Sequence, residues 1–177
     1  MDTISGGLMP TGGSVKLTID SNKVGYIVTP NGRLLKTFAG EIDTTYTGKE
    51  GNILYLVPKN SIDVSVEVSS LKGGITYSGD RVLDVIQCPL LTSVVALNTK
   101  SVYSNNSSLT AKAIGDILQN AYTKNQLVCD YSFVGGNNAL KGEVNSYLIA
   151  TYSGLTFATV NTRLVTTNGG TILIDTV

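Results

Sequence analysis

The stretch Leu91-Thr-Ser-Val-Val-Ala-Leu-Asn98, with the residues that follow it as far as Tyr122, decides the fold of this chain. It opens with a short apolar run, passes through the corner Val102-Tyr-Ser-Asn-Asn106, and ends in a compact amphipathic segment. Apolar runs of this length bounded by turn residues are typical of strands. We therefore expect a strand, a turn, a second short strand, an asparagine corner and a helix, in that order.

The helix over 110–122 carries the strongest local signal, because its apolar residues fall on a single stripe. The members of the stripe are Leu109, Ala113, Ile114, Ile117, Leu118 and Ala121. Thr110 is placed as the N-cap, where its hydroxyl can accept from an early backbone N–H that has no partner in the helix. Leu109 and Ile114 then occupy the positions of a hydrophobic staple. So narrow a stripe must pack on an apolar surface, which the neighbouring strands can supply.

Length and composition bound the class of protein. The 177 residues are 42% hydrophobic, with 13 acidic and 13 basic residues and no net charge, which suits one domain or two small ones. Zero net charge argues against a nucleic-acid partner, because a protein that binds nucleic acid normally needs a basic patch. It suits a chain that is packed among other proteins in an assembly, because copies do not repel one another. No apolar run is long enough to cross a bilayer and no secretory signal opens the chain, so we expect no membrane partner and assembly in a host cytoplasm. Two cysteines, Cys88 and Cys129, are expected to be buried free thiols.

The first 70 residues divide into an arm and a β domain. Residues 1–13 are glycine-rich and nearly uncharged, so they form either a frayed terminus or an extended arm that orders on a neighbouring subunit through Leu8, Met9 and Pro10. Residues 14–70 alternate apolar and polar positions between turn signals such as Pro30-Asn-Gly32. They are expected to form a small antiparallel sandwich or barrel.

Residues 71–177 mix strands and helices, so the whole chain is expected to be α+β. After the helix at 110–122 come an expected strand at 127–133, a second helical stripe over 140–152 that Gly154 would end, and a strand at 155–161. The last elements, Arg163 to Thr167 and Thr171 to Asp175, flank Asn168-Gly-Gly170 and are expected to pair as a C-terminal hairpin.

The stretch Leu91 to Asn106 resembles a leucine-rich repeat, in which a short strand precedes an asparagine that hydrogen-bonds the turning backbone. Asn98 and either Asn105 or Asn106 stand where that asparagine would be. The resemblance covers residues 71–160, although valine often replaces leucine and the repeat length drifts. It implies a short leucine-rich-repeat-like α/β unit, similar to repeat proteins of bacteria and their phages. Together with the preceding β module, the chain resembles virion accessory proteins of tailed phages: capsid auxiliary proteins, head fibres or tail accessories.

Catalysis lacks its usual parts in this sequence. With no histidine, Ser-His-Asp and Cys-His schemes are excluded and the commonest metal ligand is missing, so we expect no catalytic residue, no cofactor and no metal. The Ser-x-x-Lys spacing of Ser69 and Lys72 falls on a strand edge before two glycines. Among 13 acids some pairs are inevitable, and those that a carboxylate-based hydrolase would use are Asp80 with Asp84 and Asp130 with Glu143.

Tyrosine is the more informative residue type, with nine copies and no tryptophan. Tyr131, Tyr147 and Tyr152 are candidate partner contacts because tyrosine is enriched in interfaces, although the commoner explanation is that such rings line the core with the hydroxyl at its rim. We expect a non-enzymatic structural protein of a virion, homo-oligomeric or bound to other virion proteins. The alternative is a carbohydrate- or cell-surface-binding module that uses the tyrosine-bearing face.

Overall fold

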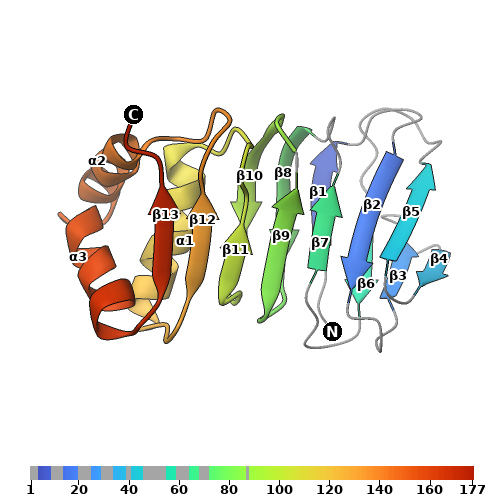
Figure 1. Ribbon diagram of the computed structural model, residues 1–177, viewed down its shortest axis with the longest axis horizontal. Coiled ribbons are helices and arrows are strands. Elements are labelled where there is room, and N and C mark those ends of the chain that lie inside the picture. Colours follow the sequence, from blue (N-terminus) through green and yellow to red (C-terminus); the bar gives the residue numbers. More distant parts are fainter. Residues whose placement is uncertain are drawn as a thin grey trace.

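Two β-sheets run along the length of the molecule, one in front of the other (Figure 1). The computed structural model describes the backbone of seven strands between residues 4 and 67, and residues 72–86 and 88–177 continuously. In spatial order, the first sheet contains β10 (Leu91–Val95), β8 (Lys72–Tyr77), β1 (Ile4–Leu8), β6 (Tyr55–Pro58), β3 (Gly25–Val28) and β4 (Leu34–Phe38). The second contains β13 (Thr171–Ile174), β12 (Asp130–Phe133), β11 (Ser101–Tyr103), β9 (Val82–Ile86), β7 (Val64–Glu67), β2 (Ser14–Ile19) and β5 (Glu41–Thr45).

Both sheets cross the domain boundary expected at residue 70. Strand β7 pairs in parallel with β9, and β8 pairs antiparallel with β1. Strand β1 lies between β6 and β8 of its own chain, so the segment Ile4–Leu8 of the expected arm is used internally instead of reaching a neighbour. Met9 and Pro10 lie outside the described residues.

From β7 onward the second sheet is parallel, because the chain winds in coils that return to this sheet once per coil. Register pairs Val64 with Leu83 and Val82 with Ser101, which makes each of these coils 19 residues long. The next coil, from Ser101 to Asp130, has 29 residues, and the coil from Asp130 to Thr171 has 41.

The coils lengthen because helices replace strands in the opposite wall. In the 19-residue coil from Val82 to Ser101 that wall is strand β10, and in the 29-residue coil it is helix α1 (Ala111–Thr123). In the 41-residue coil it consists of α2 (Lys141–Thr151), α3 (Phe157–Asn161) and the π-helix η1 (Thr162–Thr167) (Figure 1). The five residues of β10 span about 17 Å at the rise of a strand, whereas the 13 residues of α1 span about 20 Å at the rise of a helix. A helix therefore needs more than twice the residues to cover the same height of core.

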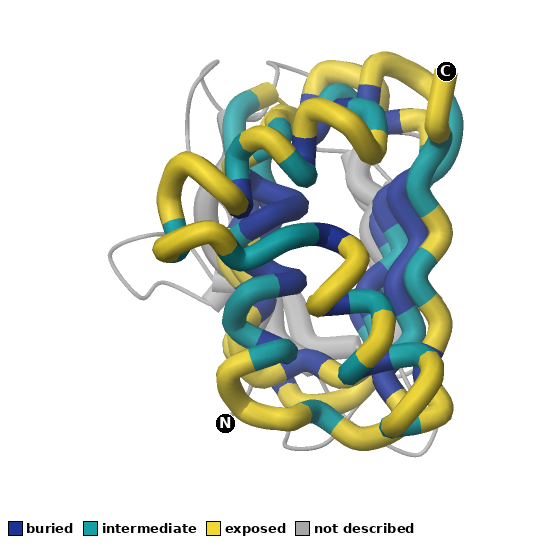
Figure 2. The backbone as a smooth tube through the Cα atoms, turned by 90° about the vertical axis from the view of Figure 1, so that its left-hand side faces the viewer, coloured by how far each residue is buried: buried dark blue, intermediate teal, exposed yellow. Residues whose placement is uncertain are grey.

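The core of the described part lies between the parallel sheet and the opposite wall of β8, β10 and the helices, where the buried residues face each other (Figure 2). Leu83, Val102 and Tyr131 align across β9, β11 and β12 and are at most 2% exposed. The helices contribute buried residues to the same core, spaced three or four apart along each helix. They are Ala113, Ile114, Ile117, Leu118 and Ala121 from α1, Val144 and Leu148 from α2, and Phe157, Val160 and Leu164 from α3 and η1.

Several sequence predictions for residues 91–154 are confirmed. Strands β10 and β11 and helix α1 occur in the expected order, and the Thr110 hydroxyl accepts from the Ala113 N–H at 3.1 Å as the N-cap. Leu109 and Ile114 are both buried, as a hydrophobic staple requires. Helix α2 ends before Gly154, whose φ of 80° suits glycine. Both cysteines are free and buried.

The expected strand at 155–161 and the C-terminal hairpin are wrong. Residues 157–167 form α3 and η1, and Thr156 caps α3 by accepting from the Thr159 N–H at 3.1 Å. Phe157, Val160 and Leu164 have helical spacing and all are buried, so packing overrides the β propensity of the surrounding threonines and valines. Strand β13 forms at the expected place but pairs in parallel with β12.

The strand expected at 127–133 starts later, at Asp130. Val128, inside the expected range, is 69% exposed and has a φ of 50°, which no regular strand adopts. Only Cys129, at 1% exposure, points into the core as expected.

Candidate functional site

Strand β13 is at the end of the parallel sheet and is paired on one side only. The Thr171 N–H donates to the Cys129 carbonyl at 2.8 Å. Alternate residues of a parallel strand bond the same neighbour, so the N–H and C=O groups of Ile172 and Ile174 point away from β12. Within the described part of the chain, no hydrogen bond uses these outward groups. We call this row of backbone groups the terminal edge. Figure 2 looks onto this end of the molecule.

Exposed apolar side chains accompany the terminal edge. Leu173, on the strand itself, is 53% exposed. Leu127 and Val128, just before β12, are 62% and 69% exposed, and the Val128 N–H donates to Asn168 close to the start of β13. An unpaired strand with apolar neighbours is a surface on which another strand can pair.

Of the predicted partner contacts, Tyr131 is in the core, and its prediction is wrong. The side chain is 2% exposed, its ring stacks on Phe133, and its hydroxyl donates to the Thr99 carbonyl at 3.3 Å. The reason is strand alternation, because Tyr131 and Phe133 share the inner face of β12 while Asp130 lies on the other. Burial raises the pKa of Tyr131 well above its ordinary value.

Tyr147 and Tyr152 lie together at the junction of α1 and α2, with their rings edge to face at 6.0 Å. Both hydroxyls donate to one carboxylate oxygen of Asp116, at 2.7 and 2.5 Å, and Lys112 donates to the other at 2.6 Å. Burial acts to raise the pKa of Asp116, but these three hydrogen bonds outweigh it, so the pKa is lowered. Both rings are half-buried and both hydroxyls are engaged within the chain, and their contact with a partner stays a prediction.

Asp130 and Glu143, one of the carboxylate pairs considered for hydrolysis, accept hydrogen bonds from different parts of the chain. Asp130 accepts from the Tyr103 hydroxyl and, at 2.8 Å, from the Thr171 hydroxyl on the outer face of the parallel sheet. This raises the pKa of Tyr103 to about 12, chiefly through the Asp130 hydrogen bond. Glu143 instead accepts from the Leu140 N–H at 2.7 Å at the start of α2. No group of three metal-ligating side chains occurs among the described residues.

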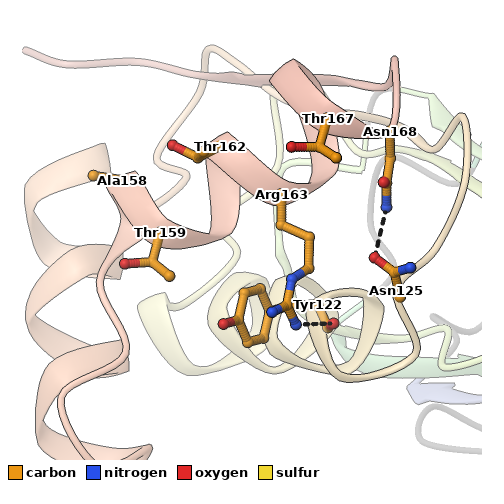
Figure 3. Close-up of a pocket in the computed structure, with 8 residues that line it drawn as sticks. All are labelled: Tyr122, Asn125, Ala158, Thr159, Thr162, Arg163, Thr167 and Asn168. Carbon is orange, nitrogen blue, oxygen red and sulfur yellow. Dashed lines mark hydrogen bonds between the residues drawn. The ribbon is translucent and has the colours of Figure 1, made fainter.

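A hollow lined mainly by polar residues lies between the end of α1 and the helices α3 and η1, with a volume of about 530 Å³ (Figure 3). Its lining residues are Tyr122, Asn125, Ala158, Thr159, Thr162, Arg163, Thr167 and Asn168. The Arg163 guanidinium carbon lies 3.8 Å from the centre of the Tyr122 ring, and one of its nitrogens donates to the Tyr122 carbonyl at 3.2 Å. Sequence reasoning did not single out Arg163, because only the helical path of 157–167 brings it to α1.

Comparison with known proteins gives no match: no family model, curated protein or solved structure is similar to this chain. In the described part of the chain, no helix has both the length and the apolar character needed to cross a bilayer.

Proposed function

We propose that this chain is a non-enzymatic structural protein that assembles through the terminal edge. The observation that carries the proposal is the outward direction of the Ile172 and Ile174 backbone groups, which lack partners within the described part of the chain. Unsatisfied backbone donors and acceptors beside apolar side chains favour pairing with another strand. The partner we propose is a second copy, because two identical edges can pair antiparallel about a twofold axis, the commonest symmetry of homo-oligomers.

The assembly we propose is the virion of a tailed phage, with the chain as a capsid auxiliary protein, head fibre or tail accessory. The leucine-rich-repeat-like character of residues 71–160 supports this, since the coils place a strand, an asparagine-bearing corner and a helix in sequence. Asn105 accepts from the Val134 N–H of the next coil at 3.0 Å, as the asparagine of such a repeat bonds a turning backbone. Balanced charge also lets copies approach without repulsion.

The test of assembly is the molar mass in solution, measured by size-exclusion chromatography with light scattering. We expect a defined dimer, and we expect Leu173→Lys to shift it to monomer because a lysine on an edge strand obstructs strand pairing. Ile149→Lys is the matched control, since Ile149 is 45% exposed on α2 and its change adds the same charge away from β13. A wild-type monomer at all accessible concentrations, or equal effects of the two lysines, contradicts the proposal.

The virion assignment has its own test. Particles purified from the phage that encodes the chain should contain it at a fixed copy number by quantitative mass spectrometry. Particles that lack the chain would remove the virion role while leaving assembly through β13 in place.

A further inference from the structure

We propose that the hollow around Arg163 binds the carboxylate of an acidic sugar, a site separate from the terminal edge. Arg163 is the only charged residue among those that line it. The rest are a tyrosine, an alanine, three threonines and two asparagines, and hydroxyl and amide groups are suited to hydrogen-bonding sugar hydroxyls. The volume of about 530 Å³ lies within the range of small-molecule sites.

The guanidinium is held in place before any ligand arrives. It stacks on the Tyr122 ring at 3.8 Å and donates one hydrogen bond to the Tyr122 carbonyl at 3.2 Å. An arginine has five N–H donors, and the described part of the chain supplies no carboxylate and no second acceptor to this one. The remaining donors can therefore form a two-pronged bond with a carboxylate, and little side-chain entropy is lost when they do.

The backbone around Arg163 is also unusual. Arg163 lies in the π-helix η1, where the Asn168 N–H bonds the Arg163 carbonyl at 3.0 Å. Such wide turns often occur at functional sites. Figure 3 shows Arg163 descending from η1 over Tyr122, with the Asn125–Asn168 pair to one side and Thr159 to the other. The Asn168 amide donates to the Asn125 oxygen at 3.0 Å, which ties both rims of the hollow together.

These contacts favour a sugar acid over an inorganic anion. A phosphate or sulfate uses the guanidinium alone, whereas the threonine and asparagine groups lie on both sides of it and can contact a ring that carries hydroxyls. A neutral sugar leaves the fixed cation without an anionic partner. The proposal therefore requires both the carboxylate and the ring.

The experiment is an NMR titration of the full chain that follows the side-chain Nε–H of Arg163, with galacturonate, galactose and inorganic phosphate as probes. We expect galacturonate to shift this signal with a Kd on the order of 1 mM, and the other two to bind about tenfold more weakly or not at all. No response to galacturonate, or a phosphate response as strong as that to galacturonate, overturns the proposal.

Two variants separate binding from folding. Asn125→Asp keeps the acceptor for Asn168 but puts a carboxylate beside Arg163, and should weaken galacturonate binding about tenfold with the fold intact. Arg163→Gln lacks the Nε–H signal, so its titration is followed through the side-chain amide of Asn168 in the same hollow, and it should also bind galacturonate about tenfold more weakly. Lys100→Gln, at an exposed residue in the turn before β11, is the equal-charge control. Unchanged binding in a folded Asn125→Asp protein, by circular dichroism, contradicts the site.

Discussion

At the scale of single residues, Asp116 ties the first two helices of the last coils together. Its carboxylate accepts from Tyr147 on α2, from Tyr152 just after α2, and from Lys112 on α1. Since the carboxylate is partly exposed, solvent screens these bonds and each contributes modestly. The cluster therefore joins α1 to the C-terminal part of α2 by polar contacts in addition to their apolar packing.

We expect Asp116→Asn to lower the free energy of unfolding by roughly 1 kcal/mol at neutral pH, because the hydrogen bonds to the charged form are lost. The pKa of Asp116 is lowered from 3.8 in the folded chain, so its contribution is present above that value and disappears as the pH falls through the lower folded pKa. Urea unfolding of both proteins between pH 7 and about pH 3 measures the difference. If the difference in free energy of unfolding between the two proteins grew toward acid pH, the charged form of Asp116 would not be the stabilising one.

Asn138 is a buried amide that holds one corner of the coils to the next. It is 8% exposed, accepts from the Leu109 N–H at 2.9 Å and donates to the Ser104 carbonyl at 2.7 Å. Replacing it with alanine leaves both backbone groups buried without a partner. We expect Asn138→Ala to destabilise the chain by about 2–4 kcal/mol.

The neighbouring Asn137 supplies the control, because its side chain is exposed and only its backbone N–H bonds Ser107. Asn137→Ala should change the free energy of unfolding by no more than about 0.5 kcal/mol. Equal effects of the two alanines in chemical denaturation would mean that the amide of Asn138 has no part in stability.

At the scale of elements, the corner after β12 depends on a close approach between coils. Gly136 has a φ of 65°, and a Cβ there would lie 2.6 Å from the Ser107 carbonyl oxygen and 2.7 Å from the Asn106 carbonyl carbon. Gly154 also has a positive φ, 80°, but a Cβ there meets nothing within 4 Å. Comparing substitutions at the two glycines therefore separates the energetic effect of a positive φ from that of close packing.

We expect Gly154→Ala to destabilise the chain by about 1–2 kcal/mol, the energy of placing an L-residue in the left-handed region. Gly136→Ala should destabilise it by roughly 3–5 kcal/mol, since two segments of backbone must also move apart. Thermal and urea unfolding give both values. If the two substitutions prove equivalent, the corners do not pack as closely as the structure places them.

The elements also show what sequence could and could not predict. Helix α1 was predictable because its stripe, cap and staple agree with its packing, and they are all local. The segment 157–167 was not, because its threonines and valines favour a strand, while the burial of Phe157, Val160 and Leu164 against distant elements selects a helix. No local pattern indicates the role of Asn138, since its hydrogen-bond partners lie 29 and 34 residues away. The Arg163 hollow depends on the same helical path and was missed for that reason.

At the scale of the whole molecule, the parallel coils make the chain nearly one-dimensional from β7 to β13. From β9 onward each strand of this series pairs only with the strands of adjacent coils, while β7, at its start, also pairs with β2. In such an array stability is the sum of coil and interface terms, so the end coil can open while the others stay folded.

Leu164→Ala tests this directly. Leu164 is fully buried in η1, so its truncation leaves a cavity in the last coil and should destabilise that coil by about 2–4 kcal/mol. Hydrogen exchange read by mass spectrometry should show lost protection over β13, α3 and η1, with β11 and α1 little changed. Leu118→Ala, at an equally buried site in α1, should instead reduce protection on both sides of the middle coil. If Leu164→Ala lowers protection equally from β8 to β13, the coils unfold as one block and not coil by coil.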